Sequence, residues 1–143
     1  MLAIGELRKL EILSFLGSKI KELSGEIGNL SYLKLLDLTR CFDLQQIPSG
    51  LLSSLSHLEE LYMFGVRHVD WEPMEGNNEG ANANLIELMS LSYLVALQIQ
   101  IPNIKLLPND LAFSELDDQP MEWLDFSLGK GNFFFYHYCK DAV

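Results

Sequence analysis

The stretch Leu33–Leu44, which reads Leu-Lys-Leu-Leu-Asp-Leu-Thr-Arg-Cys-Phe-Asp-Leu, decides the fold of this chain. Leu36 and Leu38 are two positions apart, so on a short strand both side chains point to the same, buried face. Cys41 falls in the turn after that strand, where a small side chain can satisfy backbone groups that the strand leaves unpaired. One such unit cannot bury its own apolar face, so similar units must stack on it.

Similar units occur at regular offsets along the chain. The Leu36/Leu38 pair recurs 23 positions earlier, 25 positions later and a further 36 positions on, as Leu13/Phe15, Leu61/Met63 and Leu97/Ile99. With its flanking leucines and Cys41, the stretch fits L-x-x-L-x-L-x-x-[N/C]-x-x-L, the signature of a leucine-rich repeat. The sequence therefore predicts an α/β repeat fold: a leucine-rich-repeat solenoid of about four repeats, with short parallel strands on the concave face and short helices or turns on the convex face.

The repeats divide the chain into two expected parts. Residues 1–116 form the leucine-rich-repeat domain, interrupted by an inserted acidic, Asn- and Gly-rich loop at 65–84. Residues 117–143 form an irregular, divergent tail that can add one further strand or hairpin. Within it, Met121–Phe126 resembles a fifth strand pattern, and Phe133–Tyr138 is a β-prone run that forms either the last strand or an exposed tail.

Several smaller features complete the expected organisation. Helical turns are predicted within 49–57 and around 85–91, and Asn84 is a suitable N-cap for the second. Trp71 is interpreted as an anchor of the inserted loop to the core rather than as a ligand contact. The chain opens inside a repeat without a polar cap, which favours a fragment or a module of a longer protein.

Composition and charge exclude several classes of function. With 48% hydrophobic and 21% charged residues, the 143-residue chain is typical of a folded domain. Its longest uncharged run, 88–104, is interrupted by polar residues in repeat register, so no membrane span is predicted. The net charge of −10 disfavours nucleic-acid binding, and we interpret it as a solvated surface rather than the mark of a basic partner. Two cysteines and no secretory signal favour a cytoplasmic location.

The sequence shows no pattern of a catalytic or cofactor site. Phosphate-binding G-x-x-x-x-G-K-[S/T] and nucleophile G-x-S-x-G motifs are missing. The three histidines lie far apart without the spacing of metal ligands. Glu59 and Glu60 are adjacent on a strand, so they point to opposite faces and cannot act as a pair. We therefore expect no enzyme activity, no cofactor and no metal.

A solenoid instead offers the side of its strands that faces away from the core. Residues that alternate with the buried pairs point to this concave side, which is the usual contact surface of such proteins. Exposed aromatic groups there are favoured binding anchors, although the same side chains can simply pack on one another or on the inserted loop. The predicted protein-binding residues are Ser14, Leu16, Asp37, Thr39, Glu60, Tyr62, Phe64, Gln98 and Gln100, and Cys41 is assigned a structural role.

Residues 26–41, Glu-Ile-Gly-Asn-Leu-Ser-Tyr-Leu-Lys-Leu-Leu-Asp-Leu-Thr-Arg-Cys, and the Ile-Pro-Ser-Gly-Leu-Leu segment that opens 47–63 resemble a known family. It comprises the plant nucleotide-binding leucine-rich-repeat disease-resistance proteins of the coiled-coil class, and the resemblance covers about residues 4–116. It implies that the repeats sense a pathogen effector or a guarded host protein, and that they restrain the nucleotide-binding domain of the parent receptor. The nucleotide-binding motifs themselves are missing here.

Two other interpretations stay open at this stage. A stand-alone cytosolic leucine-rich-repeat scaffold for protein–protein interaction would have the same repeats. A repeat segment of a larger enzyme, such as a receptor kinase, fits less well, because the chain has no secretory signal.

Overall fold

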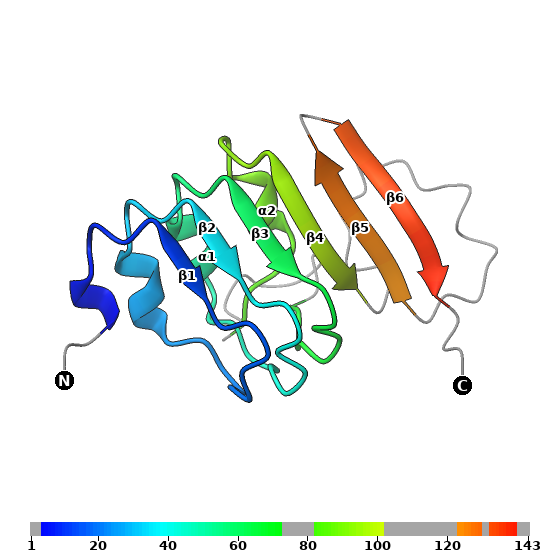
Figure 1. The fold of residues 1–143 in the computed structure, drawn as a ribbon, viewed down its shortest axis with the longest axis horizontal. Helices are drawn as coiled ribbons and strands as arrows, with labels where there is room; N and C mark the ends of the chain where they lie inside the picture. The colour runs from blue at the N-terminus through cyan, green and yellow to red at the C-terminus, as the bar shows by residue number, and fades with distance from the viewer. Residues whose placement is uncertain (1–3, 73–81, 102–122, 130–131, 140–143) are drawn as a thin grey trace.

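The structure, a computed structural model, describes residues 4–72, 82–101, 123–129 and 132–139. Six strands form one sheet in sequence order (Figure 1). Four short helical segments lie on one side of the first four strands: the 3-10 helices η1 and η2 and the α-helices α1 and α2. The bounds are η1 Ile4–Glu6, β1 Ile12–Ser14, η2 Gly25–Asn29, β2 Leu35–Asp37, α1 Leu51–Ser54, β3 Glu60–Met63, α2 Ile86–Met89, β4 Ala96–Ile101, β5 Trp123–Gly129 and β6 Asn132–Cys139.

The strands β1 to β4 are parallel, and their register follows the sequence repeats. Leu36 of β2 is paired with Leu13 of β1 on one side and with Leu61 of β3 on the other, and Leu61 is paired with Leu97 of β4. These pairs have the offsets of 23, 25 and 36 positions at which the sequence pattern recurs, so the four predicted strands are confirmed. A parallel four-stranded sheet with a few short helices is compatible with an α/β repeat.

The core lies between the strands and the helical segments. Leu36, Leu38 and Leu44 from the opening stretch are 0% exposed, as is Cys41. The helical segments contact one another in chain order, η1 with η2, η2 with α1 and α1 with α2. Each unit therefore covers the apolar side of the next, as stacked units must. Trp71 is buried in this same core, which agrees with its interpretation as an anchor.

The last two strands depart from the parallel arrangement. β5 runs antiparallel to β4, with Ile99 opposite Phe126, and β6 runs antiparallel to β5. β5 overlaps the 121–126 pattern expected as a fifth strand, but its direction is opposite to that of the four parallel strands. Alternation of apolar residues specifies which face of a strand is buried, but it does not specify the direction in which the strand runs. The Phe133–Tyr138 run lies in β6. The boundary expected at residue 116 and residues 73–81 of the inserted loop lie outside the described residues.

The two α-helices lie where helical turns were expected, and α2 begins one residue later than Asn84 alone would indicate. The Asn84 Oδ1 atom accepts a hydrogen bond from the Ile86 N–H at 3.1 Å, while Leu85 occupies the residue before the helix. One-residue differences of this kind are normal at helix ends. Within the described segments, no helix has both the length and the apolar character needed to cross a membrane.

A buried carboxylate ties α2 to the start of α1. Glu87 is only 8% exposed. Its Oε2 accepts a hydrogen bond from the Gly50 N–H and its Oε1 accepts one from the Ser53 N–H, both at 3.2 Å. These amides belong to the first turn of α1, whose own residues supply no side-chain cap. Glu87 therefore caps a helix of the preceding unit and holds two units together.

Replacement of Glu87 by Ala is expected to destabilise the fold by about 1–3 kcal/mol, because two partly buried amides lose their acceptor. Urea unfolding followed by circular dichroism measures the change. Glu26→Ala is the matched control, since Glu26 is an exposed glutamate on η2 and its replacement should cost far less. Equal losses of stability in the two variants would show that the Glu87 cap contributes nothing specific.

Candidate functional site

The side of β1 to β4 that faces away from the core presents three rows of side chains across the strands. We call this surface the strand face, and it consists of these rows. The first two follow the pairing register, and the third follows the backbone hydrogen bonds that continue it, such as Gly17 N–H to the Thr39 carbonyl. In order, the rows are Ile12, Leu35, Glu60 and Ala96; Ser14, Asp37, Tyr62 and Gln98; and Leu16, Thr39 and Phe64.

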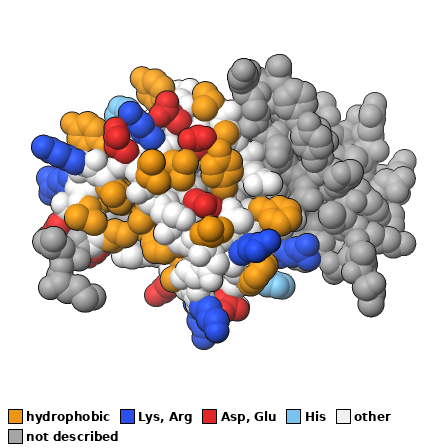
Figure 2. Space-filling model, viewed as in Figure 1, with side chains coloured by type: hydrophobic (Ala, Val, Ile, Leu, Met, Phe, Trp, Pro, Cys, Tyr) orange, Lys and Arg blue, Asp and Glu red, His pale blue; other side chains and the backbone are white. Residues whose placement is uncertain are grey.

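Apolar groups make up much of the strand face. Leu16 is 62% exposed, Ile12 is 63% exposed and Phe64 is 43% exposed. Figure 2 shows hydrophobic side chains gathered over the first strands, with acidic side chains between them. Exposed large apolar groups that share one face, instead of being scattered singly, are typical of contact surfaces. The structure thus brings together all the predicted binding residues except Gln100.

The polar side chains at the centre of the strand face are linked by hydrogen bonds. Asp37 accepts one from the Thr39 N–H at 2.9 Å and one from the Ser14 hydroxyl at 3.5 Å. The Tyr62 hydroxyl donates to the Glu60 Oε1 atom at 2.7 Å. This hydrogen bond is the largest factor that raises the pKa of Tyr62 to about 12, followed by partial burial and by the negative charges of Glu60 and Asp37. Both carboxylates therefore act on the same hydroxyl group.

Gln100 differs from its prediction as an exposed binding residue, because the structure leaves it only 2% exposed. Its Oε1 atom accepts hydrogen bonds from the Gly65 N–H at 2.8 Å and from Arg67 Nε at 3.5 Å. Gly65 has a φ of 83°, so the chain turns sharply after β3 and leaves a buried amide that needs an acceptor. The alternation of residues along the strand does not predict that the Gln100 side chain accepts a hydrogen bond from this turn.

Cys41 lies in the core rather than on the strand face. Its thiol donates a hydrogen bond from Sγ to the Phe15 carbonyl oxygen at 3.0 Å, which joins two neighbouring units. Burial is the largest factor that raises the pKa of this thiol. A buried thiol with a raised pKa is a poor nucleophile, so the geometry fits packing and not reactivity.

A second exposed feature was missed by the sequence analysis. Tyr32, His57 and Tyr93 occupy equivalent positions just before β2, β3 and β4, and Tyr32 and Tyr93 are 60% and 59% exposed. The rings of His57 and Tyr93 are stacked, with centroids 5.7 Å apart and an angle of 10° between planes. In the sequence, the equivalence of these three positions is visible in the repeated segments Leu-Ser-Tyr-Leu, Leu-Ser-His-Leu and Leu-Ser-Tyr-Leu.

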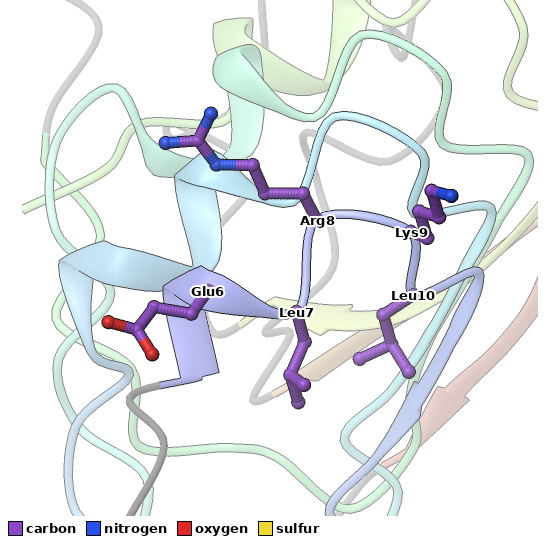
Figure 3. A pocket seen from close by; sticks show the side chains of 5 residues that line it. All are labelled: Glu6, Leu7, Arg8, Lys9 and Leu10. Carbon is purple, nitrogen blue, oxygen red and sulfur yellow. The ribbon is translucent and has the colours of Figure 1, made fainter.

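The described residues offer little that could hold a small ligand. A hollow of about 540 Å³ is lined by the consecutive residues Glu6, Leu7, Arg8, Lys9 and Leu10. Figure 3 shows that Arg8 and Leu7 point to opposite sides of this loop, so its side chains do not converge on one point. Across the segments that the structure describes, no group of three or more His, Cys, Asp or Glu side chains is arranged to bind a metal ion.

Comparison with known proteins gives one informative likeness. No protein-family model matches the chain. A disease resistance protein of Arabidopsis thaliana is 33% identical to it over 103 residues, which cover 72% of this chain. The match supports a relationship to plant resistance proteins. It also suggests a role in plant defence. The matched part spans only 10% of the length of that relative.

Replacement of Gln100 by Leu is expected to cost about 1–3 kcal/mol of stability, because it leaves the buried Gly65 amide without its acceptor. Gln98→Leu on the same strand is the control, since Gln98 is only half-buried and belongs to the strand face. Chemical unfolding of the two variants beside the wild type measures the difference. If Gln98→Leu destabilises the protein as much as Gln100→Leu, the hydrogen bond to Gly65 is not the cause.

The Tyr62–Glu60 pair predicts a dependence of stability on alkaline pH. The pKa of Tyr62 is raised from 10.0 to about 12 in the folded protein. The folded state therefore keeps this proton after the unfolded state has lost it, so the contribution is complete below pH 10 and is lost between about pH 10 and 12. Glu60→Gln should bring the pKa of Tyr62 back toward its ordinary value.

Ultraviolet titration of tyrosinate measures this change, and the difference between wild type and Tyr62→Phe isolates the signal of Tyr62. An unchanged titration in Glu60→Gln would contradict the assignment of the hydrogen bond as the main cause.

Proposed function

We propose that this chain is a leucine-rich-repeat segment of an intracellular plant immune receptor, and that its strand face recognises another protein. The observation that carries the proposal is the strand face itself, where three rows of side chains from separate units lie side by side in register. Such rows form a continuous surface that none of the units could present alone.

The chemistry of the strand face supports protein recognition. Leu16 and Phe64 provide exposed apolar groups, and Tyr62 provides a ring with a polar end. Binding energy at interfaces is concentrated in a few such groups, with aromatic side chains over-represented among them. Asp37 accepts a hydrogen bond from the Thr39 N–H and Glu60 accepts one from the Tyr62 hydroxyl, so these polar groups are held in place and less entropy is lost on binding.

The likeness to a plant resistance protein supports a role in plant defence. On this proposal the partner is a pathogen effector or a guarded host protein, and the same repeats restrain the nucleotide-binding domain of a parent receptor. The setting is the cytoplasm, and the activity is binding rather than catalysis. The alternative proposal is a stand-alone cytosolic scaffold for protein–protein interaction. It uses the same strand face, but it restrains no nucleotide-binding domain.

The double variant Tyr62→Ala/Phe64→Ala is expected to lower partner capture by about tenfold or more, because interface anchors of this kind each contribute more than about 1 kcal/mol. The chain is expressed in leaf tissue as a fusion to a biotin ligase, and biotinylated proteins are quantified for wild type and variant. Circular dichroism of the purified variant confirms that the fold is retained.

The matched control is Tyr32→Ala/Tyr93→Ala, which removes two exposed aromatic rings that lie before the strands and outside the strand face. The control should keep the wild-type set of labelled proteins. The proposal fails if the strand-face variant keeps that set too, or if the control loses as much of it.

A further inference from the structure

The strand face carries two carboxylates that have no cationic partner among the residues that the structure describes. Within the described segments, Asp37 and Glu60 accept hydrogen bonds from neutral groups: the Thr39 amide, the Ser14 hydroxyl and the Tyr62 hydroxyl. Neither carboxylate forms an ion pair with any residue of the described segments. The structure therefore places two negative charges among apolar groups without neutralising them.

These two carboxylates are close neighbours across the sheet. Leu35 is paired with Glu60 and Asp37 with Tyr62, so Asp37 and Glu60 are diagonal neighbours on the same side of adjacent strands. Such positions are about 7–8 Å apart at the backbone. The negative charges of Glu60 and Asp37 both contribute to the raised pKa of Tyr62, because both carboxylates lie near its hydroxyl group.

Lys34, which lies directly before β2, does not cancel the charge of these two carboxylates. Lys34 forms an ion pair with Glu11 at 3.1 Å, just before β1 and β2. Glu59 adds to the negative field at the same lysine. At the start of the strands the acidic groups therefore outnumber the basic ones, and Arg40 lies beyond the other end of β2. The sequence alone favours a solvated surface as the explanation of the negative charge. The position of these two charges on the strand face instead indicates contact with a partner.

We propose that the partner presents an arginine-bearing apolar segment to the strand face, an inference that rests on the proposed function and names the chemistry of its partner. The guanidinium lies between the carboxylates of Asp37 and Glu60, near the Tyr62 ring. Apolar side chains on either side of the arginine cover Leu16 and Phe64. A planar guanidinium suits this place because it can donate to two carboxylates at once and stack on an aromatic ring.

The test uses the full 143-residue chain and a fluorescein-labelled peptide in which leucine and arginine alternate. A second peptide replaces each arginine by citrulline, which keeps the planar shape but removes the charge and has a carbonyl oxygen in place of one nitrogen donor group. Fluorescence anisotropy at low and high salt gives the dissociation constants. The arginine peptide should bind at least about tenfold more tightly than the citrulline peptide at low salt, and this advantage should shrink at high salt.

The variant Asp37→Asn/Glu60→Gln should remove that advantage. Asn and Gln retain oxygen acceptors for the Thr39 amide and the Tyr62 hydroxyl, so the local hydrogen bonds can persist. The matched control is Glu6→Gln/Glu26→Gln, which removes the same net charge from exposed residues of the helical segments. The control should keep the arginine peptide within about twofold of its wild-type affinity.

The outcomes separate this inference from the proposed function. Equal binding of both peptides would overturn the inference, because apolar contact would then explain the binding. An equal loss of affinity in the control variant would also overturn it, because overall charge would then explain the effect. If Tyr62→Ala/Phe64→Ala still weakens peptide binding in that case, the strand face remains a recognition surface. If neither the charge variant nor the aromatic variant changes binding, or if no peptide binds, both the inference and its basis in the strand face are wrong.

Discussion

The whole structure depends on the pairing of short parallel strands whose leucines stack in register. Leu13, Leu36, Leu61 and Leu97 are consecutive partners across four strands, and the last three are buried. Strands of three to six residues are too short to be stable alone, so each unit depends on the apolar side of its neighbour. The same pairing that buries one side of the sheet sets the other side in rows, so the strand face is a direct consequence of the core.

Two polar side chains show how neighbouring units are joined beyond leucine packing. Glu87 supplies acceptors to the first turn of α1, and Gln100 supplies one to the turn after β3. Both side chains are buried, and both act on backbone amides of the preceding unit. Buried amides without an acceptor are costly, so these contacts fix the position of the units after the inserted loop relative to those before it. The geometry of the strand face across β3 and β4 depends on them.

A surface that recognises proteins must combine apolar contact with a means of selecting partners. On the strand face, Leu16 and Phe64 supply the first, while Asp37 and Glu60 supply charge that the described part of the chain leaves without a cation. Buried or half-buried charge at an interface favours partners that complement it and rejects those that do not. The likeness to a plant resistance protein suggests a role in plant defence, and the recognition surface proposed above would act in that role.

The sequence by itself determined the four strands, their register and most of the strand face. A period of two within each strand and fixed offsets between units leave little freedom, because a slip by one residue would expose every leucine. Only the tertiary structure decided the direction of β5, the burial of Gln100 and the cap supplied by Glu87. These features depend on contacts between segments far apart in the chain: a turn at Gly65 needs an acceptor from β4, and the first turn of α1 needs one from α2. No local sequence pattern predicts which distant side chain will accept the hydrogen bond of such a backbone amide.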